Sequence, residues 1–200
     1  ELATPEAFKR NPGLVWRWYD FRREAVKNVQ PNPGHRALVA LEKKVPHLSI
    51  VTQNVDGLHA TAGSESIIEL HGNIGRVKCF DRDHYAENVP AGLEEPPKCH
   101  CGSLLRPDVV WFGESLPQTQ MHDAFRLAEE CDVMLVVGTS GLVQPAASLP
   151  YMAKRAGAKV VEINPDDTSI TDISDIYLRG ASGEILPRVV NALDALKARN

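Results

Sequence analysis

Two polar clusters in the sequence contain residue types that can perform chemistry. His71 stands after a short apolar run and before Gly72, so its imidazole can lie exposed in a cleft and act as a general base. Gln53, Asn54 and Asp56 follow a second apolar run, and their amides and carboxylate can hold a carboxamide and ribose hydroxyls by directed hydrogen bonds. Taken singly, each cluster also fits a structural interpretation, as a surface histidine or a polar turn.

A third cluster, Gly138, Thr139 and Ser140, follows the clearest apolar run of the chain. Glycine lets a ligand approach the backbone closely, and the two hydroxyls can reach phosphate or ribose oxygens. The cluster matches neither a P-loop nor the GxGxxG fingerprint. It therefore indicates a nucleotide contact through its position after a strand, and not through a known motif.

The apolar runs predict strands that alternate with helices. Strands are expected at 48–52, 67–70, 133–137, 159–163 and 176–178, an extended segment at 109–112, and helices starting at Thr4-Pro5, at 13–29, 35–44 and 120–130, from 145, and at 183–199. This alternation predicts an α/β fold, a Rossmann-like parallel sheet with helices on both faces. Ligands of such sheets bind beyond the carboxyl ends of the strands, where the three clusters and Asn164 stand, so a nucleotide-sized ligand is expected.

Composition narrows the class of protein. The 200 residues have 43% hydrophobic content and a net charge of -4, which predicts a globular chain with no direct contact to nucleic acid. No apolar run approaches the ~18 residues of a membrane span, and residues 1–5 do not resemble a signal peptide, so a cytoplasmic protein without a membrane partner is expected. In a reducing compartment the four cysteines favour a metal role over disulfides.

Residues 79–107 lose the periodicity of the rest of the chain. They hold three cysteines, four prolines and many charges, and we interpret them as a small loop-rich insert of the zinc-ribbon kind. Segments 1–78 and 108–200 would then form one nucleotide-binding domain. Cys79, Cys99 and Cys101 are the candidate metal ligands, whereas Cys131 is interpreted as an ordinary core residue.

The ordered motifs resemble those of the sirtuin family. The resemblance rests on Thr52-Gln53-Asn54-Val55-Asp56-Gly57-Leu58-His59, Glu69-Leu70-His71-Gly72, Leu105-Arg106-Pro107 with Val109-Val110-Trp111-Phe112-Gly113-Glu114, Val137-Gly138-Thr139-Ser140 with Gln144-Pro145-Ala146-Ala147, and Asn164. They occur in family order across nearly the whole chain. The resemblance implies an NAD-dependent protein lysine deacylase that releases nicotinamide and O-acyl-ADP-ribose.

The resemblance also implies roles for individual residues. His71 would be the catalytic base, Asn54 would orient the ribose or a water, Asp56 would bind the nicotinamide carboxamide, and Gln53 would lie beside them. The residues expected to hold the adenosine half of NAD are Gly138, Thr139, Ser140, Asn164 and Ala181. Those expected to pair with the backbone of an acylated substrate are Val110, Phe112, Gly113 and Glu114, as an added strand. A monomer is expected.

Tyr19 and Arg22 resemble the Tyr/Arg pair in the acyl pocket of class III sirtuins. Residues three apart on a helix share a face, and an arginine can clamp a carboxylate while a phenol adds a hydrogen bond. The resemblance therefore implies removal of succinyl or malonyl groups alongside acetyl. On spacing alone, a core tyrosine beside a solvated arginine is the more frequent arrangement, and the family resemblance favours the pocket.

Two features depart from the family pattern. The family's zinc module has two Cys-x-x-Cys pairs, but Arg82 replaces the second cysteine of the first pair, and the second pair is shortened to Cys99-His100-Cys101. A structural zinc ion needs four ligands, so the fourth would come from His84 or His100, or the metal would be lost. The family's opening strand and Gly-Ala-Gly loop have no counterpart in these residues, so a first βα unit is expected to be absent and NAD binding to be weak.

Two alternatives to a deacylase remain open at this stage. A binding module that kept a peptide groove or nucleotide pocket without catalysis would not depend on His71. An ADP-ribosyltransferase using the same NAD site would produce ribosylated protein instead of acyl-ADP-ribose.

Overall fold

A computed structural model describes residues 2–198 of the chain. The chain forms two compact units, each assembled from several segments. The first unit comprises Glu1–Gln30, Thr52–Gly57 and Glu69–Gln118, and the second comprises Pro31–Val51, Leu58–Ile68 and Thr119–Asn200. Each unit has its own sheet and its own apolar core, and each is described separately below.

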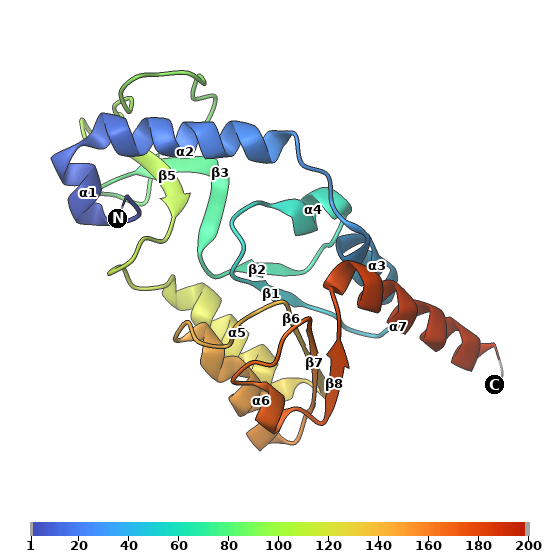
Figure 1. The fold of residues 1–200 in the computed structure, drawn as a ribbon. Helices are drawn as coiled ribbons and strands as arrows, with labels where there is room; N and C mark the ends of the chain where they lie inside the picture. The colour runs from blue at the N-terminus through green and yellow to red at the C-terminus, as the bar shows by residue number, and fades with distance from the viewer. Residues whose placement is uncertain (1, 199–200) are drawn as a thin grey trace. The chain divides into compact units, whose positions relative to one another are not determined.

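In the first unit, two helices pack beside a small antiparallel sheet (Figure 1). The elements are α1 (Pro5–Arg10), α2 (Pro12–Lys27), β3 (Gly72–Cys79), β4 (Tyr85–Ala86) and β5 (Leu105–Val109). The strand order is β4-β3-β5, and both pairings are antiparallel. Thr4 caps α1 through a hydrogen bond from the Ala7 amide, as the Thr4-Pro5 signal predicts, because a threonine oxygen satisfies an amide that has no partner within the helix.

The core of the first unit is aromatic. Phe8 and Tyr19 come from the helices, Trp111 comes from the segment after β5, and all three are at most 1% exposed. Their rings lie within 6.2 Å of that of Trp111, centroid to centroid, in tilted geometry. This cluster fixes the segment that follows β5 against α1 and α2.

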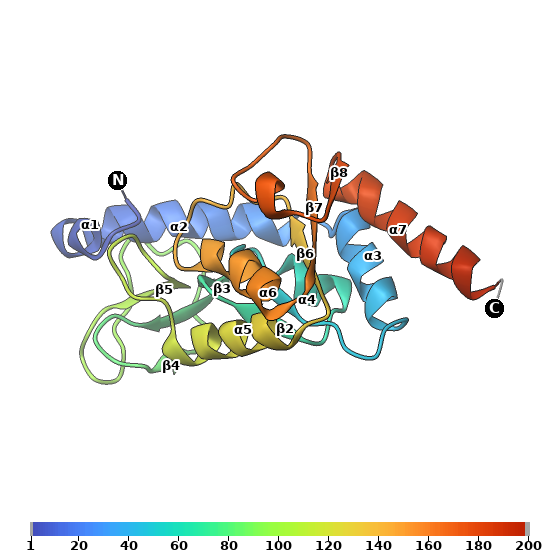
Figure 2. The same ribbon diagram turned by 90° about the horizontal axis from the view of Figure 1, so that it is seen from below.

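The second unit has a three-stranded parallel sheet with helices on both faces (Figures 1 and 2). Its elements are α3 (Pro33–Glu42), α4 (Leu58–Ala62), α5 (Gln118–Glu130), β6 (Val133–Val137), α6 (Leu149–Ala156), β7 (Lys159–Asn164), β8 (Ile176–Arg179) and α7 (Ser182–Lys197), with short 3-10 turns at Ala146–Ser148 and Thr171–Ile173. The strand order is β6-β7-β8. Because successive side chains of a strand point to opposite faces, Ile163 packs under α3 and α7, whereas Val136 and Val160 pack on the other face.

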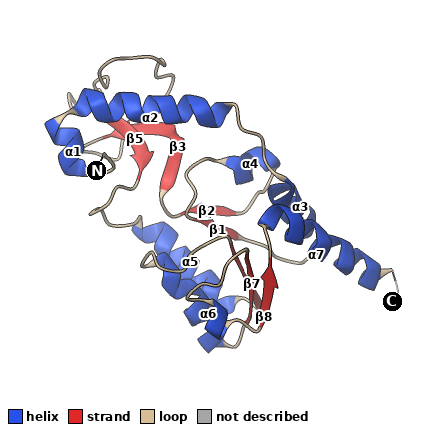
Figure 3. Ribbon diagram, viewed as in Figure 1, coloured by secondary structure: helices blue, strands red, loops and turns tan. Residues whose placement is uncertain are grey.

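A short strand pair, β1 (Ile50–Thr52) and β2 (Ile67–Glu69), carries the chain from the second unit into the first (Figure 3). β1 ends at Thr52, whose carbonyl accepts a hydrogen bond from the Leu70 amide. The residues after these two strands are the ones expected to perform chemistry.

The predicted fold class is confirmed, with a parallel α/β sheet and helices on both of its faces. Several elements were not predicted, namely α4, β3 and β4. The segment 109–112 was expected to be extended, but the strand there ends at Val109 and begins earlier, at Leu105. The expected division into an insert at 79–107 and a surrounding domain stays a prediction.

Among residues 2–198, no helix is both long and apolar enough to cross a membrane.

Candidate functional site

His71 is held in one orientation by the backbone of the neighbouring loop. Its Nδ1 lies 3.0 Å from the carbonyl oxygen of Gln53. A carbonyl oxygen can only accept a hydrogen bond, so Nδ1 must carry the proton and donate it. In the neutral ring, Nε2 then carries the lone pair. His71 is half-buried, and a neutral imidazole with its lone pair on Nε2 can accept a proton there.

The loop after β1 runs beside the His71 segment. Hydrogen bonds join Leu70 to Thr52 and Ile74 to Val55, at 3.0 and 2.7 Å, on either side of the His71 contact. This places the backbone of Gln53, Asn54 and Asp56 alongside the candidate base. The Asn54 amide donates to the Thr52 hydroxyl, which fixes the start of the loop and leaves the Asn54 side chain exposed.

Gly72 is required by the close approach of β5. Its φ is +78°, and a Cβ at this position would lie 2.1 Å from the carbonyl oxygen of Asp108. Only glycine avoids both the left-handed strain and this clash with backbone. The His-Gly pair therefore has a local structural reason: the glycine lets β3 and β5 meet, and Val110 then donates its amide to the His71 carbonyl at 2.9 Å.

In the second unit, the expected nucleotide-binding residues gather at one edge of the sheet. Gly138 follows β6, Asn164 ends β7, and Ala181 follows β8 and stands at the N-terminus of α7. Because the three strands are parallel neighbours, their carboxyl ends lie at the same edge. The N-terminus of a helix adds partial positive charge there, which suits a phosphate.

Hydrogen bonds hold this edge in shape. The Asn164 side chain donates to the Thr139 carbonyl at 2.8 Å, and the Gly138 amide donates to the Ile163 carbonyl at 3.0 Å. The Ser169 hydroxyl donates to the Gly141 carbonyl at 3.0 Å. Asn164 is therefore engaged in shaping the loop that carries Thr139, and the geometry fits a preorganised nucleotide-binding edge.

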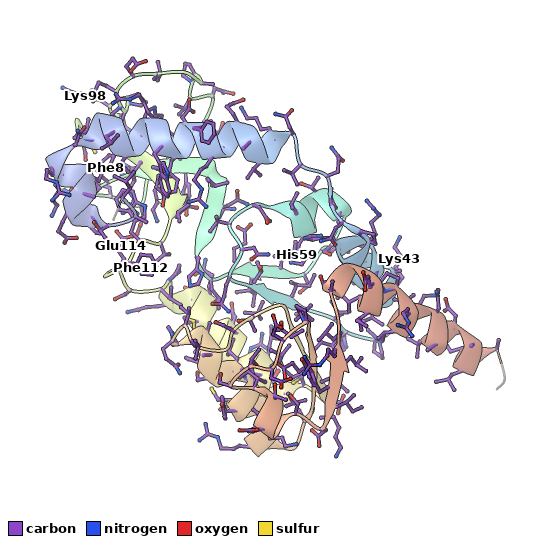
Figure 4. The ribbon with its side chains drawn as sticks, in the orientation of Figure 1. Phe8, Lys43, His59, Lys98, Phe112 and Glu114 are labelled. Atoms are coloured by element: carbon purple, nitrogen blue, oxygen red, sulfur yellow. The ribbon has the colours of Figure 1, made fainter. Side chains whose placement is uncertain are left out.

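The segment after β5 carries the expected substrate-contacting residues (Figure 4 labels Phe112 and Glu114). It forms a turn in which three amides are already used: Val110 donates to His71, Phe112 to Ala3 and Glu114 to Trp111. Phe112 is 78% exposed, which is unusual for a side chain of that size. A peptide that adds to this segment can donate its own N–H groups to the carbonyl oxygens here.

Arg106, to which the sequence assigned no separate role, holds this turn in place through its contacts with Trp111 and Glu114. Its side chain is 4% exposed, lies 3.4 Å from the centroid of the Trp111 ring, and forms two hydrogen bonds to the Glu114 carboxylate. Glu114 also accepts from the Trp111 amide at 2.7 Å. Burial acts to raise the pKa of Glu114, but the hydrogen bonds from Arg106 and Trp111 outweigh it and hold the pKa below its usual value.

Tyr19 and Arg22 are neighbours on α2, as their spacing predicts, but they differ in exposure. Tyr19 is 1% exposed, and its hydroxyl accepts a hydrogen bond from the Trp111 indole at 3.0 Å. Burial raises the pKa of Tyr19, opposed by the Trp111 hydrogen bond and by Arg22. Arg22 is exposed, and its guanidinium carbon lies 4.7 Å from the Trp18 ring centroid and 5.7 Å from that of Tyr19. Tyr19 is thus a core residue, and Arg22 is the member of the pair that solvent reaches.

A group of metal-ligating side chains lies in the segment 79–107. The three predicted cysteines, Cys79, Cys99 and Cys101, lie with His84 so that one ligand atom from each is within 4.8 Å of all the others. The sulfurs of Cys79 and Cys101 are 3.5 Å apart. Zinc–sulfur bonds of about 2.3 Å in a tetrahedron put sulfurs about 3.8 Å apart, so these residues fit a structural zinc ion. Bound there, the ion would supply cross-linking of the loops and no redox chemistry.

Comparisons with known proteins agree on one family. A family model described as "Sir2 family" matches residues 1–145. An "NAD-dependent protein deacylase" of Aquifex aeolicus is 51% identical over 196 residues, which cover 96% of this chain and 82% of the relative. The solved structure of a Sir2 homologue in complex with NAD superposes with a TM-score of 0.93 at 46% identity, and the match covers 98% of this chain and 77% of that one.

A further structure, Sir2Af2 bound to a myristoylated histone peptide, matches with a TM-score of 0.82 at 37% identity, covering 99% of this chain and 86% of the other. The sequence match, the shared fold and the positions of the motifs are mutually consistent. The chain belongs to the Sir2 family.

Proposed function

We propose that this protein is an NAD-dependent protein lysine deacylase with His71 as its general base. The observation that carries the proposal is the orientation of that imidazole, whose Nδ1 donates to the Gln53 carbonyl so that the lone pair lies on Nε2. Its family relatives bear the name of this activity. NAD, when bound, supplies the ribose carbon that accepts the acyl group, and nicotinamide is the leaving group.

In this proposal each unit has its own task. In the first unit, His71 takes a proton at Nε2 from a ribose hydroxyl, Asn54 orients that ribose or a water, and Asp56 binds the nicotinamide carboxamide. Gln53 lies beside Asn54 and Asp56 in the first unit. In the second unit, the residues that serve the adenosine half of NAD are Gly138, Thr139, Ser140, Asn164 and Ala181. Acylated lysine peptides pair with the carbonyl groups of the turn at 110–114.

We further propose that acidic acyl groups such as succinyl are substrates alongside acetyl, with Arg22 binding their carboxylate. Within residues 2–198 the Arg22 guanidinium has no hydrogen bond or ion pair, and it lies over the Trp18 ring. Arg17 on the same helix is by contrast paired with Glu94 and with the backbone of the same residue. An unpaired, aromatic-supported guanidinium is well suited to bidentate carboxylate binding.

The test is a product analysis with NAD and matched acetyl- and succinyl-lysine peptides. The proposal expects nicotinamide and O-acyl-ADP-ribose in equal amounts, only when an acylated peptide is present. ADP-ribosylated protein in place of acyl-ADP-ribose would establish the transferase alternative. Binding of peptide without nicotinamide release would establish the binding module and would refute the deacylase.

The acyl proposal has its own variants. Arg22→Met should lower kcat/KM for the succinyl peptide by about 10–100-fold, since hydrogen bonds to a charged group contribute ~1.5–3 kcal/mol, and should leave acetyl turnover almost unchanged. Arg17→Met is the matched control, because it removes an exposed arginine from the same helix. Equal losses on both peptides, or equal effects of the two variants, would contradict a carboxylate-binding role for Arg22.

A further inference from the structure

The metal-ligating group differs from the family pattern in its fourth member, and the hairpin at β3–β4 shows how. Lys78 pairs with Tyr85 across this hairpin, and the Cys79 amide donates to the His84 carbonyl at 2.8 Å. Cys79 and His84 are therefore directly opposite each other. Opposite residues of an antiparallel pair put their side chains on the same face of the sheet. The backbone thus brings the imidazole of His84 to the Cys79 thiol without help from residue 82.

The second loop presents its two cysteines in the same manner. The Cys99 amide donates to the Ser103 carbonyl at 2.7 Å, and the Gly102 amide donates back to the Cys99 carbonyl at 2.9 Å. Gly102 has a φ of +92°, which lets the chain turn back within four residues. The tightened Cys-x-Cys spacing is thereby accommodated, and the Ser103 hydroxyl bonds to Asp81 at 2.6 Å to tie the two loops together. Lys98, labelled in Figure 4, marks this loop.

The distances fit one sulfur-rich tetrahedron. Cys99 Sγ lies 3.5 Å from His84 Nδ1, equal to the 3.5 Å between the sulfurs of Cys79 and Cys101. Bond lengths of about 2.3 Å to sulfur and 2.0–2.1 Å to nitrogen give a tetrahedral S···N edge of about 3.5 Å. The donor atom of His84 is therefore Nδ1, the nitrogen that faces the sulfurs.

His100 is the competing histidine, and its geometry is different. Its Nδ1 lies 3.7 Å from Cys99 Sγ, but among the described residues it is not part of the group whose ligand atoms are all mutually close. Its ring instead stacks on that of His84, with centroids 4.3 Å apart and planes 24° from parallel. A ring in this position limits rotation of its neighbour, as groups around a metal ligand commonly do.

We propose that this protein holds zinc in a Cys3His site, in which His84 Nδ1 replaces the missing cysteine of the first family pair and His100 positions the His84 ring by stacking. Three thiolates, one neutral imidazole and Zn²⁺ carry one net negative charge, against two for four thiolates.

The test measures the metal and not the turnover. X-ray absorption of the zinc-loaded protein should show three sulfurs and one nitrogen, with the multiple scattering of an imidazole. Chelator competition should show that His84→Ala binds zinc at least about 100-fold more weakly, since even an outer-shell partner is worth ~10–100-fold. His84→Cys should restore binding with four sulfurs, which excludes misfolding as the reason for the loss in His84→Ala.

Two further variants complete the test. His100→Phe keeps the stacked ring and should retain the three-sulfur, one-nitrogen signature with affinity within about 10-fold of the parent. Cys131→Ser, which changes a cysteine outside the group, should bind zinc as the parent does. Loss of the imidazole signature in His100→Phe but not in His84→Ala would overturn the proposal in favour of His100, and three sulfurs with one water oxygen in the parent would overturn it for both histidines.

Discussion

Removal of the Glu114 carboxylate should destabilise the first unit far more than removal of an ordinary surface carboxylate. Arg106 has a side chain that is 4% exposed, and it depends on Glu114 for two of its hydrogen bonds. Breaking a fully buried pair by deleting one partner costs ~3–5 kcal/mol. Glu114 itself is 26% exposed, so water can reach the gap, and we expect a loss at the lower end, about 3 kcal/mol, for Glu114→Ala.

The assay can follow this unit alone. The three tryptophans of the chain, Trp16, Trp18 and Trp111, all lie in the first unit, so urea unfolding followed by tryptophan fluorescence reports its stability. Glu24→Ala is the control, because Glu24 pairs with Lys27 on the exposed surface of α2 in the same unit, and such a pair contributes only ~0.2–1 kcal/mol.

The pH dependence of the free energy of unfolding shows whether the ionised form of Glu114 is the one that stabilises the unit. Arg106 and the Trp111 amide lower the pKa of Glu114 against the opposing effect of burial, so its contribution is present above the unfolded-chain pKa of about 4.3 and is lost as pH falls through the lower folded value. The stability gap between parent and Glu114→Ala should therefore be full at pH 7 and should narrow in acid. A loss below about 1 kcal/mol, or a gap that widens in acid, would refute the reasoning.

Two other substitutions test backbone and hydrogen-bond arguments. Gly72→Ala should cost about 3 kcal/mol or more in the same unfolding assay, because its Cβ would meet the Asp108 carbonyl. Gly92→Ala in the same unit, with φ +73° and nothing within 4 Å, should cost only ~1–2 kcal/mol, and equal costs would contradict the clash. Thr171→Val should cost about 2–3 kcal/mol in thermal unfolding, because it removes the 2.7 Å hydrogen bond to Glu162, which is fully buried; a neutral result would contradict that role.

The elements predicted well from the sequence are the strands whose apolar residues form continuous runs along the chain. The runs that became β6 and β7 are rich in β-branched residues and lie between packed helices, so their apolar character matches their position. The helices before and after these two strands carry clear apolar faces. At the other end of the chain, the Thr4-Pro5 capping signal correctly predicted the start of α1.

The antiparallel strands of the first unit were missed for physical reasons. β5 reads Leu-Arg-Pro-Asp-Val, yet all five residues are buried, because Arg106 stacks on Trp111 and Asp108 binds Arg76 and Lys78. β3 contains a register shift between Asn73 and Val77 that breaks the alternation expected of a strand. Neither pattern can be recognised until the pairing partners are known.

The candidate site residues could be named from the sequence, but the contacts between them could not. His71 and the loop at 53–56 stand at strand ends that any reading of the apolar runs would find. The sequence offered two histidines as the fourth metal ligand, and only the hairpin that places His84 opposite Cys79 favours one of them. The burial of Tyr19 beneath Trp111 depends on a contact between residues 92 positions apart, which helical spacing alone does not reveal.

The most direct test of the central claim compares His71→Ala with the parent protein. Deacylation of an acetyl-lysine peptide would be followed by acyl-ADP-ribose formation, with NAD binding and tryptophan-monitored unfolding measured in parallel. We predict a loss of about 10²–10⁴-fold or more in kcat, with NAD affinity and stability close to those of the parent. A variant that turns over at a rate near the parent's would show that His71 is not the general base.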